Sequence, residues 1–416
     1  MADERKPEMK LGAVTWLDFR ADDLSQARDF IRSLQEEGVI DELGFLALQG
    51  RFSDLLHPAT TTLMRSARYF YFVAGIYRQL EWEGVRSSHV ALLSQQRQDA
   101  LANVLSVKES VGVIGREAGM TLRQFPSLIY WSALRKLGIL TTNLSESGYQ
   151  EEFDEIRLQR RAYHDDDKTP QGPAGPQYWD PTLPAATFID GHGHVKPGTA
   201  FTFSNAEAED LLKRFTSRFP QSLLSHMLSR RLIGITWPWD CPKTSRDLDV
   251  WLSHAKKMSL FVRGATLQYY ALLIEALDRL GGRRLNDTVP PVFEQWWAEA
   301  KRELKNWNTN EFVTVPTVAS ALRLGPKGDR WFIDGWLERF LAAPSAKALL
   351  ADGQARNLLK EREIRIKPAK ARLKHVKHLK QWKPNRVGEA VYQFNYRHNI
   401  GSRFVSEILD GMKQGQ

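Results

Sequence analysis

Residues 248–280 read LDVWLSHAKKMSLFVRGATLQYYALLIEALDRL and form a long, almost uninterrupted apolar stretch. Such a stretch predicts one or two core helices. Gly264, in its middle, has no side chain and would let a neighbouring element approach closely. The stretch carries charges throughout, and no apolar run of the chain approaches the roughly 20 residues that cross a bilayer. Residues 1–10 are charged and lack the apolar core of a signal peptide, so we expect a cytoplasmic protein without membrane contact.

Helical patterns continue on both sides of this stretch. Residues 64–83 are strongly apolar and aromatic and predict a buried helix. Ser204 followed by Glu207 is a capping box, which predicts a helix start at this point. Residues 292–306, 330–341 and 401–412 carry apolar side chains at helical spacing. With 42% hydrophobic residues and 13 Trp, the chain can build a large core, and we expect a mainly α, multi-helical fold.

Residues 111–144 hold a pattern that resembles the beginning of a winged helix. Residues 113–118 predict a short helix, and residues 126–137 a second helix that Gly138 ends. A strand is expected at 139–142, where the sequence is Ile-Leu-Thr-Thr. Tyr130, Arg135 and Lys136 lie on or near the polar face of the second helix and would touch phosphates. The alternative is a helical hairpin that packs in the core and contacts no DNA.

A segment rich in proline and glycine marks a boundary between two parts of the chain. Proline and glycine are concentrated in residues 164–200, which predicts an irregular connector. We therefore expect an N-terminal helical domain over 1–163, with its winged-helix-like segment at 111–144. A C-terminal helical domain over 201–350 and a basic segment with a closing helix over 351–416 complete the division.

Positive charge is concentrated in one segment of the chain. Of the 58 Lys and Arg, twelve lie between Arg356 and Arg386, where only Glu361 and Glu363 oppose them. The rest of the chain holds 46 basic against 47 acidic residues, so the net charge of +9 resides in this segment. Clustered cations favour polyanions such as nucleic acid. The alternative is a solvated surface that keeps the protein soluble.

The sequence contains no catalytic motif that we can identify. It has no phosphate-binding loop, no dinucleotide-binding glycine pattern, no metalloprotease pair and no Gly-x-Ser-x-Gly elbow. Cys241, the single cysteine, lies in a Pro-rich turn and is expected to be a packed thiol rather than a nucleophile. Asp190-Gly-His-Gly-His194 and Asp165-Asp-Asp167 have metal-binding side chains but no complete ligand set. We expect solvated loops there, with no metal and no cofactor.

Several segments together resemble a family of uncharacterised bacterial proteins of about 400 residues. They include Thr15-Trp-Leu-Asp-Phe19, Phe52-Ser-Asp-Leu-Leu-His-Pro58, Arg68-Tyr-Phe-Tyr-Phe72, Ser127-Leu-Ile-Tyr-Trp131 and Phe201-Thr-Phe-Ser204. The resemblance implies a place in phage-defence loci, beside helicases and phospholipase-D-like nucleases, and it supplies no catalytic residues. The family's tail tends to have a Gly/Leu-rich turn near its Trp, whereas Trp382 lies among lysines here.

These features lead to one main hypothesis, a non-catalytic DNA-binding or adaptor component of an anti-phage system. A metal-dependent nuclease with an unrecognised site and a structural partner of a helicase remain open as alternatives. The expected phosphate contacts come from two parts of the chain, the winged-helix-like segment and the basic segment. They are Arg116, Arg123, Arg135, Lys136, Lys367, Lys370, Arg372, Lys374, Lys377 and Lys380.

Overall fold

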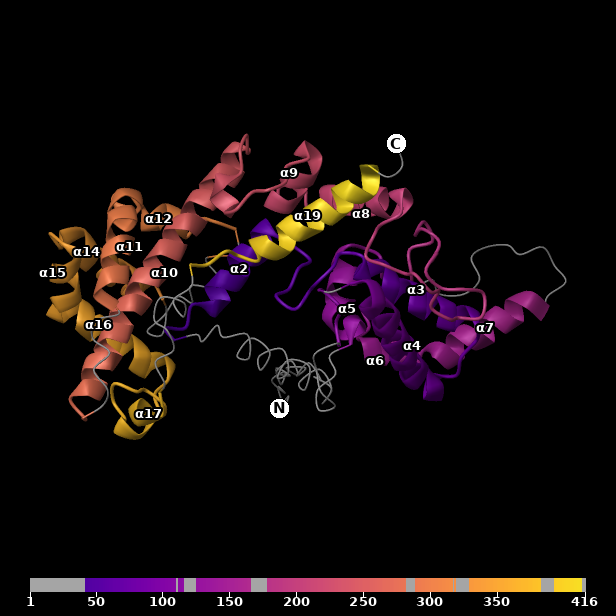
Figure 1. Cartoon of the computed structure of the whole chain (residues 1–416), viewed down its shortest axis with the longest axis horizontal. Helices are drawn as coiled ribbons and strands as arrows, with labels where there is room; N and C mark the ends of the chain where they lie inside the picture. The colour runs from indigo at the N-terminus through magenta and orange to yellow at the C-terminus, as the bar shows by residue number, and fades with distance from the viewer. Residues whose placement is uncertain are drawn as a thin grey trace, which may run out of the picture. The chain divides into compact units, whose positions relative to one another are not determined.

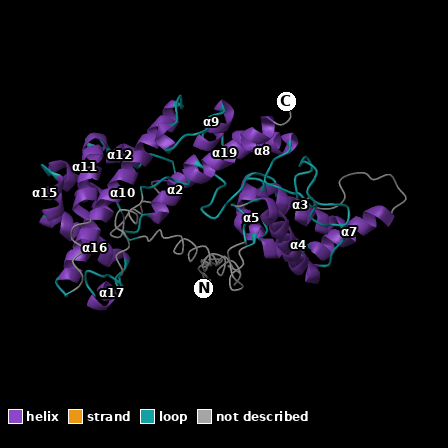
Figure 2. Ribbon diagram, in the orientation of Figure 1, coloured by secondary structure: helices purple, strands orange, loops and turns teal. Residues whose placement is uncertain are grey.

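The computed structural model describes residues 42–109, 111–115, 125–165, 178–281, 289–316, 318, 329–382 and 393–413. The chain divides into two units, Met1–Ile40 and Asp41–Gln416, and only the second contains described residues. Within the described ranges helices dominate and no strand occurs (Figure 1 and Figure 2). The expected mainly α, multi-helical fold is therefore confirmed. None of the helices in these ranges combines the length and apolar character that a bilayer span requires.

One long helix organises the C-terminal half. The stretch quoted at the start is the single helix α10 (Arg246–Asp278), with 33 residues and a length of about 50 Å. The Ser245 side chain caps its first turn by accepting from the amide of Leu248. Helices from later in the chain pack along it. They are α11 (Val289–Leu304), α16 (Gly353–Ile366) and α17 (Val376–Gln381), with α12 (Thr309–Phe312), α14 (Arg330–Ala342) and α15 (Ala346–Ala351) beside them.

Gly264 has the role that the sequence predicts for it. A Cβ atom at this position would lie 2.0 Å from Cζ2 of Trp296 on α11. The indole N–H of Trp296 donates to the carbonyl of Leu260, one turn earlier on α10, at 2.9 Å. The missing side chain thus lets the two helices approach until a buried Trp rests directly on the α10 backbone.

A second group of helices lies earlier in the chain. It is built around α3 (Tyr69–Trp82), whose side chains are buried on nearly all sides, as the sequence predicts for residues 64–83. The pairs α3 with α4, α3 with α5, and α4 with α6 are in contact. Their bounds, with those of the neighbouring helix, are α4 (Ser87–Lys108), α5 (Pro126–Lys136), α6 (Glu146–Glu151) and α7 (Phe153–Asp165).

Helices α8 (Asn205–Arg218), α9 (Leu223–Arg230) and α19 (His398–Lys413) pack together, and α2 (Leu46–Leu56) contacts α9. The predicted capping box is present at α8, where Ser204 and Glu207 satisfy each other's amides. Arg397, at the start of α19, donates to Asp54 of α2 at 2.8 Å. The closing helix predicted near the C-terminus therefore joins segments that are more than 300 residues apart in sequence.

Two expectations for the winged-helix-like segment are wrong. Residues 139–142 form no strand, only an isolated antiparallel bridge between Leu140 and Trp179. The amide of Ile139, which would continue such a ladder, instead donates to the carbonyl of Leu134 in the last turn of α5, at 3.0 Å. Tyr130 does not lie on a polar face, since it is fully buried and donates to the carbonyl of Ser66 at 2.8 Å. Residues 116–124, which include the second half of the expected short helix at 113–118, lie outside the described residues.

The contact between Gly264 and Trp296 leads to a stability prediction. We expect Gly264→Ala to lower the free energy of unfolding by about 1–3 kcal/mol or more, because the added methyl overlaps the Trp296 ring. Urea-induced unfolding measures this change.

Gly50→Ala is the matched control, because Gly50 also lies in a helix and a Cβ there would meet nothing within 4 Å. Alanine favours helices, so this variant should be unchanged or more stable by up to about 1 kcal/mol. Equal stability of the two variants would contradict the close packing of α10 on α11.

Candidate nucleic-acid interface

The basic segment divides into two sets of side chains with different surroundings. One set is matched by carboxylates from elsewhere in the fold and consists of Arg356, Arg362, Lys367 and Arg372. The other set is exposed, forms no ion pair among the described residues, and consists of Lys360, Lys370, Lys374, Lys377 and Lys380. Arg365 lies 3.7 Å from Glu361 of the same helix, and Lys383 and Arg386 lie outside the described residues. Excess positive charge is therefore carried by lysines, and the matched set is mostly arginine.

Arg362 is the most deeply buried member of the matched set, with 1% of its surface exposed. Its guanidinium lies 2.5 Å from Asp329, just before α14, and donates to the carbonyl of Leu43 at 2.9 Å. It also lies over the rings of Phe45 and Phe332, at 4.7 and 5.5 Å from their centroids. A buried cation needs such partners, because leaving water without them costs several kcal/mol.

Glu42 matches two further cations of the segment. Its carboxylate is 3% exposed and accepts from Lys367 at 3.1 Å and from Arg372. Earlier in the segment, Arg356 donates to Glu275 of α10 at 3.1 Å. These three basic residues therefore hold the segment in place, and less of their charge than of the exposed lysines' charge is available to a polyanion.

Glu363 fixes the turn that carries the exposed lysines. This carboxylate is fully buried and accepts from the amides of Arg372 and Leu373, at 2.7 and 3.0 Å. It also accepts from the Tyr269 hydroxyl of α10 at 2.5 Å. Burial, together with the adjacent Glu363 charge, raises the pKa of Tyr269 well above its usual value, so the phenol remains a donor.

Four of the five exposed lysines form what we call the lysine patch, defined as Lys370, Lys374, Lys377 and Lys380. Its inner side is anchored, since Leu379 is buried and the ring of Trp382 lies 5.5 Å from that of Tyr270 on α10. Figure 1 shows α17 beside the C-terminal part of α10. Lysines three residues apart on a helix lie on the same face. The result is a fixed positive surface of the kind that contacts phosphates.

The sequence-predicted residues of the first half lie in the other helical group. Arg135 is half-buried and donates to the carbonyl of Asn143 at 2.9 Å, while Lys136 is exposed at the end of α5. Helix α5 packs against α3 and α6, whereas α17 packs against α10. Arg116 and Arg123 lie outside the described residues. These positions remain predictions and are not part of the lysine patch.

The metal-binding side chains noted in the sequence are used in a turn. Asp190 accepts from the amides of His192 and His194, at 2.9 and 2.8 Å. Among the described residues, no group of three or more His, Cys, Asp or Glu is placed to hold a metal ion. Asp166 and Asp167 lie outside these residues. Cys241 is buried, as expected of a packed thiol, and burial raises its pKa to about 11, which disfavours a reactive thiolate.

Two buried histidines form a chemically capable cluster that the sequence did not reveal. His57 and His398 are 0% and 2% exposed, and Nε2 of His57 lies 3.1 Å from Nδ1 of His398. His57 Nδ1 lies 3.0 Å from the carbonyl of Tyr396, which can only accept, so this nitrogen carries a proton. Ser402 lies 3.2 Å from Nε2 of His398. A serine beside a histidine is one element of nucleophilic catalysis, but both rings are shielded from any substrate.

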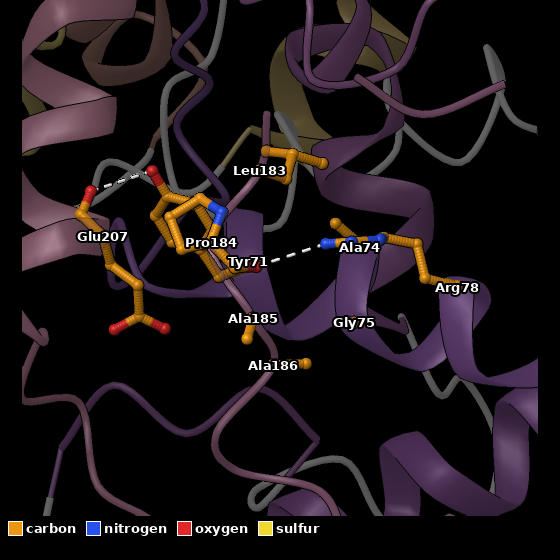
Figure 3. Close-up of a pocket in the computed structure, with 9 residues that line it drawn as sticks. All are labelled: Tyr71, Ala74, Gly75, Arg78, Leu183, Pro184, Ala185, Ala186 and Glu207. Carbon is orange, nitrogen blue, oxygen red and sulfur yellow. Dashed lines mark hydrogen bonds between the residues drawn. The ribbon is translucent and has the colours of Figure 1, made fainter. Parts of the chain in front are cut away.

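A small cavity lies between α3 and residues 183–186 (Figure 3). Its volume of about 10 Å³ has room for about one water. The Tyr71 hydroxyl donates to the carbonyl of Glu207 at 2.8 Å, and Arg78 donates to the carbonyl of Pro184 at 3.2 Å. The Tyr71 contact packs α8 on α3, and the Arg78 contact packs the connector on α3. The cavity is too small for a substrate.

Comparison with known protein families gives one match, to a family of unknown function, DUF6361, over residues 11–412. The chain belongs to the DUF6361 family. The DUF6361 match contains the lysine patch, the carboxylates that hold it and the histidine pair. Neither a curated protein nor a solved structure matches the chain.

The burial of Arg362 leads to a prediction about the basic segment. We expect Arg362→Ala to lower the free energy of unfolding by about 3–5 kcal/mol, because it leaves Asp329 without its partner. Lys360→Ala, on the same helix but exposed, should change it by no more than about 0.5 kcal/mol. Urea-induced unfolding distinguishes the two. Equal effects would contradict the division of the segment.

The histidine pair leads to a prediction of pH dependence. Burial, and for His57 also the nearby His398, lowers both pKa values below the ordinary 6.5. The unfolded chain then binds more protons, so the pair's contribution is complete above pH 6.5 and is lost as the pH falls towards the folded-state pKa. The stability advantage of the wild type over His57→Asn should therefore shrink between about pH 7 and pH 5. An advantage that is constant with pH would contradict this.

Proposed function

We propose that this chain is a non-catalytic DNA-binding component of bacterial phage defence, and that the lysine patch is its contact with DNA. The supporting observation is that Lys370, Lys374, Lys377 and Lys380 are exposed and form no ion pair with any residue that the structure describes, on a turn and helix fixed by Glu363 and Tyr269. Lysines bind phosphates as point charges, without reading base sequence. Binding would therefore be weakly sequence-specific and sensitive to salt.

The proposal narrows the set of residues that the sequence suggested. Lys367 and Arg372 are matched by Glu42 and hold the segment in place, so we assign them a structural role. Charge reversal at Arg372 would break its ion pair with Glu42, which holds the segment in place, as well as any DNA contact. A clean test therefore uses only the exposed lysines.

The defence setting rests on the resemblance described above, which implies that family members lie beside helicases and phospholipase-D-like nucleases. A chain that holds DNA near such enzymes would need no catalytic centre of its own. We accordingly propose that the nuclease or helicase activity belongs to neighbouring proteins, with this chain acting as the DNA contact or adaptor.

The test compares two triple variants with the same change in net charge. Lys374, Lys377 and Lys380 are changed to Glu in one, and the exposed Lys213, Lys305 and Lys347 in the other. Binding of a fluorescent duplex is followed by anisotropy across a salt series. We expect the patch variant to lose binding and the slope of log K against log salt to fall by about 2–3, because each lost phosphate contact removes about 0.9.

The control variant should bind nearly as the wild type does. Equal weakening in both variants would mean that overall charge, not the patch, attracts DNA. If the folded wild type binds no duplex even at low salt, the DNA contact is wrong, and the adaptor role without DNA remains.

A further inference from the structure

The loop between α9 and α10 presents two stacked indole rings. Trp237 and Trp239 lie with their ring centroids 5.2 Å apart and their planes inclined by 8°. Both are half-buried. Trp239 packs against the hydrophobic core, whereas Trp237 is not among the residues that do. The stack therefore begins at the core with Trp239 and ends with Trp237 as its outer ring.

The loop that carries this stack is fixed at both ends. The carbonyl of Ile235 lies 3.1 Å from Nε2 of His398, and the carbonyl of Pro242 lies 3.1 Å from Nε2 of His226. Between them, residues 238–240 form a 3₁₀ turn in which the amide of Asp240 donates to the carbonyl of Trp237. A ring held in advance in its position loses little conformational entropy when a ligand stacks on it.

Basic side chains precede and follow the stack in the sequence of this loop. Within residues 230–246 there are four basic side chains and one carboxylate, Asp240. The four are exposed and form no ion pair among the described residues, and they are Arg230, Arg231, Lys243 and Arg246. Asp247 and Asp249 follow in the first turn of α10, where they favour the helix N-terminus. The loop thus combines a stacked pair of half-buried rings with four basic against three acidic side chains over residues 230–249.

We propose that this loop binds single-stranded nucleic acid, with a base stacked on Trp237 and the adjoining phosphates contacted by Arg230, Arg231 and Lys243. A base in a duplex has both faces covered by its neighbours, whereas an unpaired base offers a free face to an aromatic ring. A ring pair alone would suit a protein partner equally well. The four unmatched cations favour a ligand that has both flat aromatic faces and regularly spaced anions.

This site is separate from the lysine patch. Arg246 begins α10, while Tyr270, which contacts Trp382 beside the patch, lies near its end. At 1.5 Å per residue, the two positions are about 36 Å apart along the helix. The inference therefore does not depend on the proposed duplex contact. If both are right, one chain contacts duplex and single strand at opposite ends of α10.

The experiment measures binding of a fluorescent oligothymidylate of about 15 nucleotides, by anisotropy, to the full chain at low salt. We expect Trp237→Ala to weaken binding at least about fivefold and Trp237→Phe to weaken it less, because the phenyl ring retains a stacking face. Trp82→Ala is the matched control. Trp82 is 62% exposed but lies between Glu81 and Glu83, so its loss should leave binding unchanged.

Trp237→Ala could weaken binding simply by disturbing the fold of the loop, so a second variant leaves both rings in place. Arg230→Glu with Lys243→Glu changes only exposed side chains and should also weaken binding, with unchanged circular dichroism. Binding should keep its dependence on Trp237 in the triple lysine-patch variant, which separates this site from the duplex contact. Wild-type affinity in Trp237→Ala would overturn the proposal. So would a folded wild type that binds no oligonucleotide, and the stack would then be left to an acidic protein partner.

Discussion

The architecture of the basic segment depends on the adjacent buried charges of α16. Arg362 is enclosed by Asp329, the carbonyl of Leu43 and two Phe rings, and Glu363 by two amides and the Tyr269 hydroxyl. Each charge would be costly to bury alone, and each is matched by partners from distant parts of the chain. The contacts of Arg362 join α16 to the start of α14 and to the residues just before α2. Those of Glu363 join α16 to the turn that follows it and to α10.

A consequence of this arrangement is that arginine and lysine have different roles. Guanidinium groups are planar, donate in several directions and tolerate burial, which suits Arg362 and Arg356 to their matched positions. Compact and strongly hydrated ammonium groups remain at the surface, as in Lys374 and Lys377. The same backbone that the buried pair holds rigid therefore displays unmatched positive charge. The tryptophan stack of the other end of α10 is likewise fixed by backbone contacts, to His398 and His226.

The sequence predicts the helices well, because their periodicity and caps are local. The single long α10, the Ser204 capping box and the close approach at Gly264 are all found. Charge pairing could not be predicted, since Glu42 lies 325 and 330 residues from Lys367 and Arg372.

The strand predicted at 139–142 is absent for a related reason. Its Ile-Leu-Thr-Thr sequence suits a strand, but a strand also needs a partner. The Ile139 amide donates to the last turn of α5, which leaves a single bridge to Trp179 among the described residues. Trp237-Pro-Trp239 was visible only as a turn, because stacking of its rings is a property of the folded loop.

The division of the basic segment into anchored and exposed cations is the central claim, and lysine acetylation read by mass spectrometry tests it most directly. The reagent is applied to the folded chain with and without duplex DNA at low salt. The account predicts that Lys374, Lys377 and Lys380 react quickly in the free protein and are protected by DNA, while Lys367, held by Glu42, reacts slowly in both states. Fast reaction of Lys367, or protection that spares the lysine patch while appearing elsewhere, would contradict it.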